Sequence, residues 1–592
     1  MNLPSEIRRL FRGDSRESLS IYKSGTGTQC LLARAALDYG RDVVVVLPDA
    51  RYLKEFASLA SFTANDSQGA SFWDRQWIVF PPFDPRRQEG QHEDWAARWS
   101  CLFQLKEGRR PKGIVLTLDS FLPYWPPRRV LDEEFFFLMQ GEECPPERLM
   151  EKCVCWGFER VSQTSSVGQF SARGDILDIF PPGYDLPLRL EYFGDTLESI
   201  RLFHPVSQRS SSELSEAVIL PVAPAMLQSG SIHRAEQVWD HLWTTGRLSK
   251  QAVSGLKEKT LNGEGDVPPG LFYPDPATIA DWLPSGALTF LVNPERVRSG
   301  LEEMESTWKE HLEEDPVSLG RDLPADCVLQ SQTRARQDLL SGGPQLLFEE
   351  LPLGNREQGL ELQEKRYHSF TDIFWRPQER KRPLSALSSA LEQWRETRHQ
   401  VVLLFHSEHS RHRFFRFMEG SEFTFKTRYK PEQSGIYALI SDFGAGLDLA
   451  WKQSLILSED VLQPSGQREG ARRKKDTDFQ GLERLDEIKP EDLLVHRDYG
   501  VGQFAGLTRL QVEDTGNDYL VLVYAGGDKL YVPVDRLNLV QKYKGPEGVT
   551  PSLDKLGSNR WAKTKERVRK ALETVAHDLV QVYAYRTVAK GF

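Results

Sequence analysis

A glycine-rich loop at residues 23–30, with the sequence KSGTGTQC, is the first stretch whose residue types could do chemistry. It precedes a helical pattern, as the phosphate-binding loop of nucleotide hydrolases does. Hydrolysis there needs a lysine for the β- and γ-phosphates and a serine or threonine for magnesium. Gln29 and Cys30 stand near those two positions. We therefore interpret the loop as a degenerate P-loop without ATPase activity, formed by Gly25, Gly27 and Thr28.

Histidines spaced by three residues form a second candidate site. His406, His409 and His412 could share part of a helix face and bind a metal ion. The run offers no fourth ligand, and Arg411 and Arg413 lie between and beside the imidazoles. We favour a solvated first helical turn over a metal site.

The cysteines indicate neither a zinc site nor a nucleophile. Six are scattered along the chain, and the pair Cys153 and Cys155 has no second pair at zinc-ligand spacing. The sequence also lacks the local signatures of Ser-His-Asp and Cys-His catalysis. We therefore predict no catalytic residue and no metal ligand in this chain.

The charge balance favours protein partners over nucleic acid. The formal net charge is −10, whereas proteins that wrap DNA cluster lysine and arginine on the phosphates. One basic run, Arg472–Lys475, lies in a polar stretch that we interpret as a linker, with a contact to DNA or polymerase as the alternative. No apolar run approaches the roughly 18–20 residues that span a bilayer, and the N-terminus has no signal pattern. We expect a cytoplasmic protein without membrane contact.

Several domains must position these residues, because 592 residues exceed one core. In residues 1–138, apolar runs at 42–48, 77–80 and 113–118 predict buried parallel strands, and 94–99 reads as a helix. Strands and helices that alternate in this way predict a doubly wound α/β sheet. Residues 139–225 instead show short strands and glycine turns, as in a small α+β domain with exposed hairpins.

The α/β character returns downstream. Residues 226–375 show helices and one clear strand at 288–292, and we assign them to the second part of the first domain. Residues 380–462 predict another α/β unit, with a strand at 401–405 and Ser407 as the N-cap of the next helix. We assign residues 463–484 to a linker.

The last part of the chain has the most regular pattern. Residues 485–545 hold short period-two strands and glycine turns, which predict a small SH3- or Tudor-like β-barrel. Residues 546–592 are assigned to a linker and a terminal helix. The apolar face of that helix would hold Val568, Leu572, Val575, Leu579 and Tyr583.

Two groups of segments resemble known modules. RGDILDIFPPG at 173–183, RLEYFGD at 189–195 and IRLF at 200–203 resemble the UvrA-binding domain shared by UvrB and the transcription-repair coupling factors (Mfd). HRDYGVGQFAGL at 496–507, YLVLVY at 519–524 and KLYVPV at 529–534 resemble the CarD-like RNA polymerase-interacting domain of the coupling factors. The order of the modules and the helix after Trp561 are similar to coupling factors rather than to UvrB or free-standing CarD.

The resemblance implies a function in transcription-coupled nucleotide excision repair. The full-length family is an ATP-driven translocase on double-stranded DNA that displaces stalled RNA polymerase and recruits UvrA. Its motor, which binds ATP and magnesium, follows the helix near Trp561, and this sequence ends there. We therefore expect a monomeric fragment, truncated product or half of a split protein, with no cofactor of its own and DNA contact mainly through the missing motor.

The resemblance also implies site residues. For UvrA these are Arg173, Arg189 and Phe193; for the β subunit of RNA polymerase they are Leu510, with Arg509 and Val512. Leu510 and Val512 would face the same side of an extended strand. The alternative is that Phe193 and Leu510 are core residues and that the arginines are merely solvated.

Parts of the sequence also suggest two other functions. One is a UvrB-like ATPase or helicase that uses the first domain, and the missing lysine in residues 23–30 argues against it. The other is a CarD-type transcription regulator that uses only residues 485–545, and the preceding UvrB-like module argues against it. The fold we predict is an α/β multidomain chain. Its parts are the degenerate P-loop-like domain with the inserted α+β domain, the second α/β domain, the barrel and the terminal helix.

Overall fold

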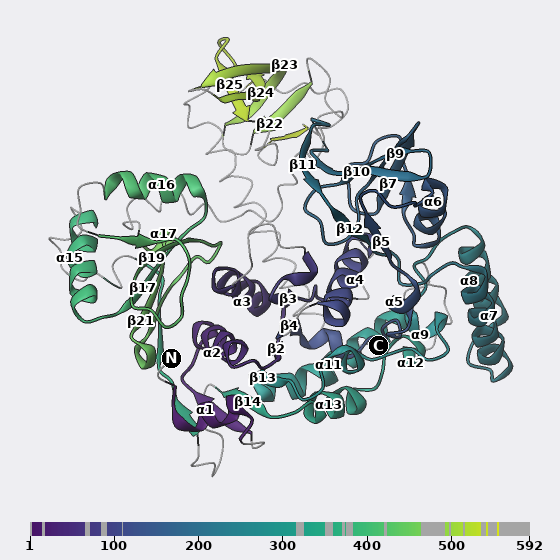
Figure 1. Ribbon diagram of the computed structural model, residues 1–592, viewed down its shortest axis with the longest axis horizontal. Helices are drawn as coiled ribbons and strands as arrows, with labels where there is room; N and C mark the ends of the chain where they lie inside the picture. The colour runs from purple at the N-terminus through teal and green to yellow at the C-terminus, as the bar shows by residue number, and fades with distance from the viewer. Residues whose placement is uncertain are drawn as a thin grey trace, which may run out of the picture. The chain divides into compact units, whose positions relative to one another are not determined.

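The computed structural model divides into two compact units, residues 1–467 and 468–592, and each is described by itself (Figure 1). The described residues are 3–14, 18–64, 72–84, 91–108, 111–205, 207–314, 325–349, 359–369, 373, 383–418, 423–462, 492–496, 499–512, 515–533, 540–542, 553 and 555. The predicted linker at 463–484, with its basic run, and the predicted terminal helix lie outside them.

A seven-stranded sheet forms the centre of the first unit. Its order is β15-β1-β14-β13-β2-β4-β3, and all neighbours pair in parallel. The strands are β1 (Leu19–Tyr22), β2 (Val43–Leu47), β3 (Trp77–Val79), β4 (Gly113–Thr117), β13 (Leu288–Val292), β14 (Gln345–Glu349) and β15 (Gly359–Glu361). The flanking helices are α1 (Ser5–Arg12), α2 (Thr26–Asp38), α3 (Ala50–Thr63), α4 (Gln91–Glu107), α11 (Pro294–Glu314) and α13 (Gln332–Ser341).

Alternate side chains of each strand enter different cores, as a sheet covered on both faces requires. Val43 and Val45 of β2 pack in the cluster that holds α2 and α3. Val44 and Val46 pack in the cluster that holds α4 and α11. The prediction of a parallel sheet with helices on both faces is therefore confirmed.

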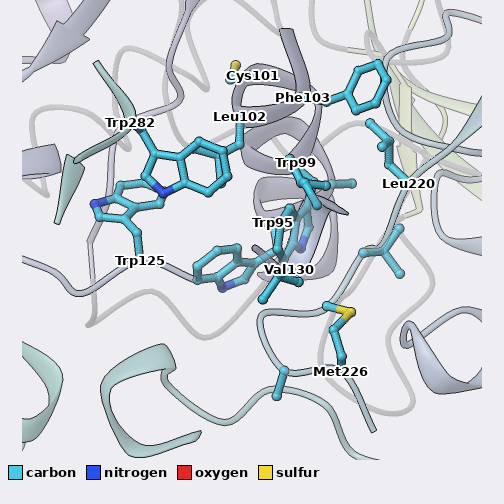
Figure 2. Packing of buried hydrophobic residues seen from close by; sticks show 14 of the residues in the cluster. Trp95, Trp99, Cys101, Leu102, Phe103, Trp125, Val130, Leu220, Met226 and Trp282 are labelled. Atoms are coloured by element: carbon cyan, nitrogen blue, oxygen red, sulfur yellow. The ribbon is translucent and has the colours of Figure 1, made fainter. Parts of the chain in front are cut away.

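Tryptophans dominate the second of these cores. Figure 2 shows Trp95 and Trp99 of α4 gathered with Trp125 and Trp282. Each buried indole N–H needs an acceptor. Trp99 donates to the carbonyl of Ala223 at 2.8 Å, across to the segment that follows the next domain. This core thus joins the parallel sheet to residues 130–226.

The smaller domain inserted after β4 is built from hairpins. Its six-stranded sheet has the order β11-β10-β9-β8-β7-β6, antiparallel except between β6 and β7. The strands are β6 (Glu159–Arg160), β7 (Gln169–Arg173), β8 (Ile176–Ile179), β9 (Leu188–Phe193), β10 (Thr196–Phe203) and β11 (Ser210–Leu214). It also holds α6 (Pro146–Cys155) and the antiparallel pair β5 (Phe136–Met139) and β12 (Glu216–Ile219).

Residues 226–375 contain more strands than we predicted. The helices are α7 (Ser229–Thr244), α8 (Lys250–Leu261), α9 (Pro269–Phe272), α10 (Ile279–Trp282) and α12 (Ala325–Val328), besides α11 and α13. The expectation of one clear strand was wrong, because β14, β15 and β16 (Glu364–Tyr367) follow β13. The sequence of β16, EKRY, is polar because it is an edge strand, so no apolar run marks it.

A second α/β sheet has the order β16-β20-β21-β17-β19-β18. Its edge strand β16 precedes residues 380–462, the range that we predicted for this unit. The other strands are β17 (Gln400–Phe405), β18 (Phe425–Lys426), β19 (Gly435–Ile440), β20 (Gly446–Leu449) and β21 (Ser454–Ser458). The helices are α15 (Pro383–Glu396), α16 (Glu408–Phe417) and α17 (Glu459–Leu462). Ser407 caps α16 by accepting a hydrogen bond from the backbone of Ser410, as predicted.

The two sheets share the helices α2 and α3 (Figure 1). Val402 and Leu404 of β17 belong to the same core cluster as Leu31 of α2 and Phe56 of α3. Residues 26–37 are all buried, so α2 is a helix covered on every side and has no polar face. The other face of the second sheet packs against α15 and α16.

The second unit contains one five-stranded antiparallel sheet with the order β25-β24-β23-β22-β26. The strands are β22 (Leu493–His496), β23 (Gly500–Val512), β24 (Thr515–Val523), β25 (Lys529–Pro533) and β26 (Val540–Lys542). Its core holds Leu494, Phe504, Leu520, Leu522, Tyr524, Val532 and Val540. The strands that we predicted are confirmed, whereas closure of the sheet into a barrel stays a prediction.

Candidate protein-interaction sites

Two tight hairpins end side by side in the inserted domain. In the first, Arg173 pairs with Ile176 around a turn at Gly174, whose φ is 58°. In the second, Phe193 pairs with Thr196, and the turn glycine has a φ of 59°. Such left-handed positions suit glycine because it has no Cβ to clash. Strands β8 and β9 are neighbours, so both turns lie at the same end of the sheet.

Register places the residues that we predicted on one face. Directly paired residues point to the same side, and so does every second residue of a strand. Ile176 pairs with both Arg173 and Glu191, and Phe193 lies two residues beyond Glu191. Arg189 lies two residues before Glu191. We call this surface the hairpin face; the opposite face packs in the core through Leu188, Leu190 and Tyr192.

Phe193 is the most exposed aromatic side chain of the hairpin face. It is 76% exposed, and the neighbouring Ile176 is 37% exposed. The alternative that Phe193 is a core residue is therefore wrong. An exposed phenylalanine beside an exposed isoleucine is the kind of apolar patch that marks a protein contact. Arg173 is also exposed, and its guanidinium donates to the carbonyl of Ser162.

Arg189 has a different environment from the other two. Its Nε and one Nη donate to the two oxygens of Asp178, both at 2.8 Å, in a bidentate pair. Asp178 is buried, and the Arg189 side chain is only 18% exposed. The guanidinium also lies 4.5 Å from the Phe203 ring centroid and donates to the side-chain oxygen of Gln208 at 3.1 Å. These hydrogen bonds raise the pKa of Arg189, with Asp178 as the main cause.

Sequence reasoning missed Asp178 and Ile176. Asp178 stands in an apolar run, where a lone carboxylate predicts a buried partner. That signal could have identified Asp178, but the partner, Arg189, follows only from the pairing of β8 with β9. Ile176 looks like part of the same apolar run and becomes exposed because it borders the turn.

The second candidate site is the long hairpin of β23 and β24. Leu510 pairs with Asn517, Arg509 with Asp518 and Val512 with Thr515. β22 pairs with β23 only as far as Gln503, and β25 pairs with β24 only from Tyr519 onwards. Among the described residues, the end of β23 therefore pairs with β24 alone, and its other edge could accept a further strand.

The loop that we interpret as a degenerate P-loop holds a carboxylate of the same chain. The loop joins β1 to α2, and the backbone N–H groups of Gly25, Gly27 and Thr28 all point at the carboxylate of Glu364. Glu364 belongs to β16 of the second sheet, more than 330 residues away along the chain. Nothing in the local sequence of the loop could have indicated this partner.

Among the described residues, the histidines and cysteines do not gather into a site. His406 hydrogen-bonds the carboxylate of Asp460 at 3.1 Å, and His412 lies 3.8 Å from Glu408 on its own helix. No group of three or more histidine, cysteine or acidic residues suited to a metal ion occurs in the described parts of the chain. Cys153 is buried on α6. A search of the described helices finds none that is long and apolar enough to cross a membrane.

Comparisons with known proteins bear on both surfaces. A family model for the UvrB interaction domain matches residues 136–224, which include the hairpin face. A model for the CarD-like/TRCF RID domain matches residues 488–544, which include the hairpin of β23 and β24. Both matches fall on the modules whose resemblance the motifs indicated.

Three similar proteins share a name. The transcription-repair-coupling factor of Myxococcus xanthus is 29% identical over 538 residues, which cover 83% of this chain and 42% of the relative. That of Bacillus subtilis is 24% identical, covering 84% and 43%. That of Escherichia coli is 26% identical, covering 96% and 49%. This chain thus spans less than half the length of these relatives. With its UvrB interaction domain and its CarD-like RID, the chain corresponds to the N-terminal region of the transcription-repair-coupling factors.

Proposed function

We propose that this chain is a two-sided docking module of transcription-coupled nucleotide excision repair. In this proposal the hairpin face binds UvrA, and the hairpin of β23 and β24 binds the β subunit of RNA polymerase. The observation that carries the proposal is the exposure of Phe193 at the tip of the UvrB interaction domain. A fold would gain from burying this ring, so its exposure fits a surface kept for a partner.

UvrA binding rests on Phe193 and Arg173 in this proposal, while Arg189, on the same face of the sheet, has a structural role. A phenylalanine on a hairpin tip can fill an apolar pocket, and arginine can fork onto a carboxylate. The guanidinium of Arg189 already makes its bidentate hydrogen bonds to Asp178. We therefore propose that Arg189 holds β9 against β8, the strands that carry Phe193 and Ile176.

Polymerase binding rests on strand addition. The open edge of β23 can supply backbone hydrogen bonds, while Leu510 and Val512 supply specificity from one side of the strand. The side chains of Leu510, Arg509 and Val512 lie outside the described ones, so their part in the contact belongs to the proposal. The match of residues 488–544 to the RID supports this proposal.

Binding measurements on the full chain test the UvrA site. UvrA on a biosensor surface should bind the parent chain, and Phe193→Ala should weaken binding by about 2 kcal/mol, or roughly thirtyfold, the scale of an interface hot spot. Val154→Ala is the matched control, because Val154 is 54% exposed on α6 of the same domain. Equal binding by Phe193→Ala and the parent would remove the assignment.

The polymerase site is tested in the same format with RNA polymerase on the surface. Leu510→Arg should lose binding, while Tyr531→Ala, a change of an exposed side chain on β25, should not. Hydrogen exchange of residues 493–533 monitors folding. Leu510→Arg that stays protected and binds at full strength contradicts the proposal, and loss of protection would identify Leu510 as a core residue.

A UvrB-like ATPase is the weaker candidate. Glu364 places a carboxylate where the phosphates would lie, so like charges would meet in the loop. Phosphate release from ATP by the purified chain would revive this candidate.

A further inference from the structure

The N–H groups that would cradle a phosphate in a P-loop all bind one carboxylate. Gly25 N donates to Glu364 Oε2 at 3.1 Å, Thr28 N to the same oxygen at 2.7 Å, and Gly27 N to Oε1 at 3.3 Å. Gly25 is the N-cap of α2, so these donors lie at the positive end of a helix of 13 residues. The carboxylate thus takes the place of an anionic ligand.

The fit between loop and carboxylate leaves no room for another group. A Cβ on Gly25 would lie 2.4 Å from Glu364 Oε1, and one on Gly27 would lie 2.6 Å from Leu447 Cδ1. Both glycines are therefore required by close approach of the second sheet rather than by their own backbone angles. The absence of a Cβ at these two positions lets Glu364 of β16 and Leu447 of β20 approach the loop.

Other contacts join the same two surfaces around this point. Trp451 donates its indole N–H to Thr28 Oγ1 at 3.1 Å, directly beside the loop. Arg366, two residues after Glu364, forms an ion pair with Glu55 of α3 at 2.7 Å. Apolar side chains of both sheets complete the interface in one core cluster. The hydrogen bonds of Glu364 to the loop thus lie among other contacts that join the two sheets.

We propose that Glu364 is an internal ligand of the degenerate P-loop, and that it latches the second α/β sheet onto the first by taking the position of a phosphate. The N–H groups of the loop, which are suited to an oxoanion, bind a carboxylate of the same chain. We call this group of donors the socket. A free oxoanion can occupy that socket only when the carboxylate is absent or withdrawn.

The electrostatics agree with a carboxylate held in a socket. Burial raises the pKa of Glu364, and the N–H groups of Thr28, Gly27 and Gly25 oppose that rise by favouring the charged form. A cleft of about 270 Å³ opens beside the carboxylate and is lined in part by Lys23, Tyr52 and Arg366. This cleft gives a small anion a path to the loop.

Hydrogen exchange on the full chain, followed by mass spectrometry, tests the latch. Glu364→Ala should speed exchange of the loop at 23–31 by about tenfold to a hundredfold, since buried N–H groups lose their acceptor. It should also speed exchange of β19, β20 and β21 at 435–458, which the latch holds in place. The matched control is Glu361→Ala, which removes an exposed carboxylate three residues away that forms an ion pair with Lys23.

Inorganic phosphate separates a socket from a simple structural contact. In the Glu364→Ala chain, phosphate should slow exchange of residues 23–31 relative to chloride at equal ionic strength, and in the parent chain it should have no effect. If Glu364→Ala does not fold, Glu364→Gln is used, since its amide keeps the volume but opposes one N–H donor; its exchange should exceed that of Glu361→Gln.

Three results would overturn the inference. One is parent-like exchange in the Glu364 variants. A second is faster exchange confined to the loop, with residues 435–458 unchanged, which would mean that Glu364 satisfies the loop without holding the sheets together. The third is a Glu364→Ala chain on which phosphate acts no differently from chloride.

Discussion

Replacement of Arg189 by alanine should unfold the hairpin face rather than merely remove a contact. The change leaves the carboxylate of Asp178, which is 4% exposed, without its bidentate partner. Removing one partner of a buried ion pair costs about 3–5 kcal/mol of folding free energy. This figure includes the smaller loss of the contact between the Arg189 guanidinium and the Phe203 ring. Losing an exposed ion pair costs less than about 1 kcal/mol. The burial of Asp178 is therefore what makes the loss of Arg189 severe.

The neighbouring strand offers a matched control. Arg201 pairs directly with Arg189 in the register of β10 and β9. Its side chain is 40% exposed and makes a longer contact, 3.4 Å, with Glu191. Arg201→Ala should therefore cost less than about 1 kcal/mol. The two substitutions differ in burial and in hydrogen bonding, not in residue type or strand pair.

Hydrogen exchange of residues 169–203 in the full chain measures the difference. A loss of 3–5 kcal/mol corresponds to exchange faster by roughly a hundredfold or more, at tenfold for each 1.4 kcal/mol. The double change of Asp178 and Arg189 to alanine should be less harmful than Arg189→Ala alone, because no buried charge is left without a partner. Equal exchange in Arg189→Ala and Arg201→Ala, or faster exchange in the double variant than in Arg189→Ala, would contradict this prediction.

Three further outcomes follow from ionisation and burial. Burial lowers the pKa of Lys452 to about 7. The unfolded chain then binds more protons between pH 7 and about pH 10, so stability should rise with pH in this window, and Lys452→Met should flatten the rise in urea midpoints. Asp460 raises the pKa of His406. The stabilisation from the His406–Asp460 pair should be present below about pH 6.5 and lost as pH rises through the raised pKa of His406 in the folded state. Asp460→Asn should abolish this loss in thermal melts. Burial raises the pKa of Cys101 to about 12. A thiol reagent should therefore label the partly exposed Cys155 before Cys101, as followed by peptide mass spectrometry. Labelling of Cys101 before Cys155 would contradict this.

Much of the fold could be predicted because its signals are local. The run at 42–48 is apolar at every position of β2, since both faces of that strand are covered. The turns at Gly174 and Gly194 carry the residue that their backbone angles require. Ser407 stands where a side chain can cap the first turn of α16. Each of these signals lies within a few residues of the structure that it specifies.

The rest depends on residues far apart in the chain. The polar strand β16 has no apolar signal, yet it supplies Glu364 to a loop near the N-terminus. The role of Arg189 follows from the register of two strands, which no single segment contains. Motif resemblance selected Arg189 together with Phe193, and only the structure separates a side chain that holds the surface from one that could bind through it.

In the proposed function, one chain holds RNA polymerase and UvrA at the same time. The direct measurement loads RNA polymerase on a biosensor, adds the chain, and then adds UvrA. We predict that UvrA is retained only when the chain is present, that Phe193→Ala weakens the UvrA step alone, by roughly thirtyfold, and that Leu510→Arg abolishes the step in which the chain binds. Failure to retain UvrA on a surface that has bound the parent chain would contradict the account.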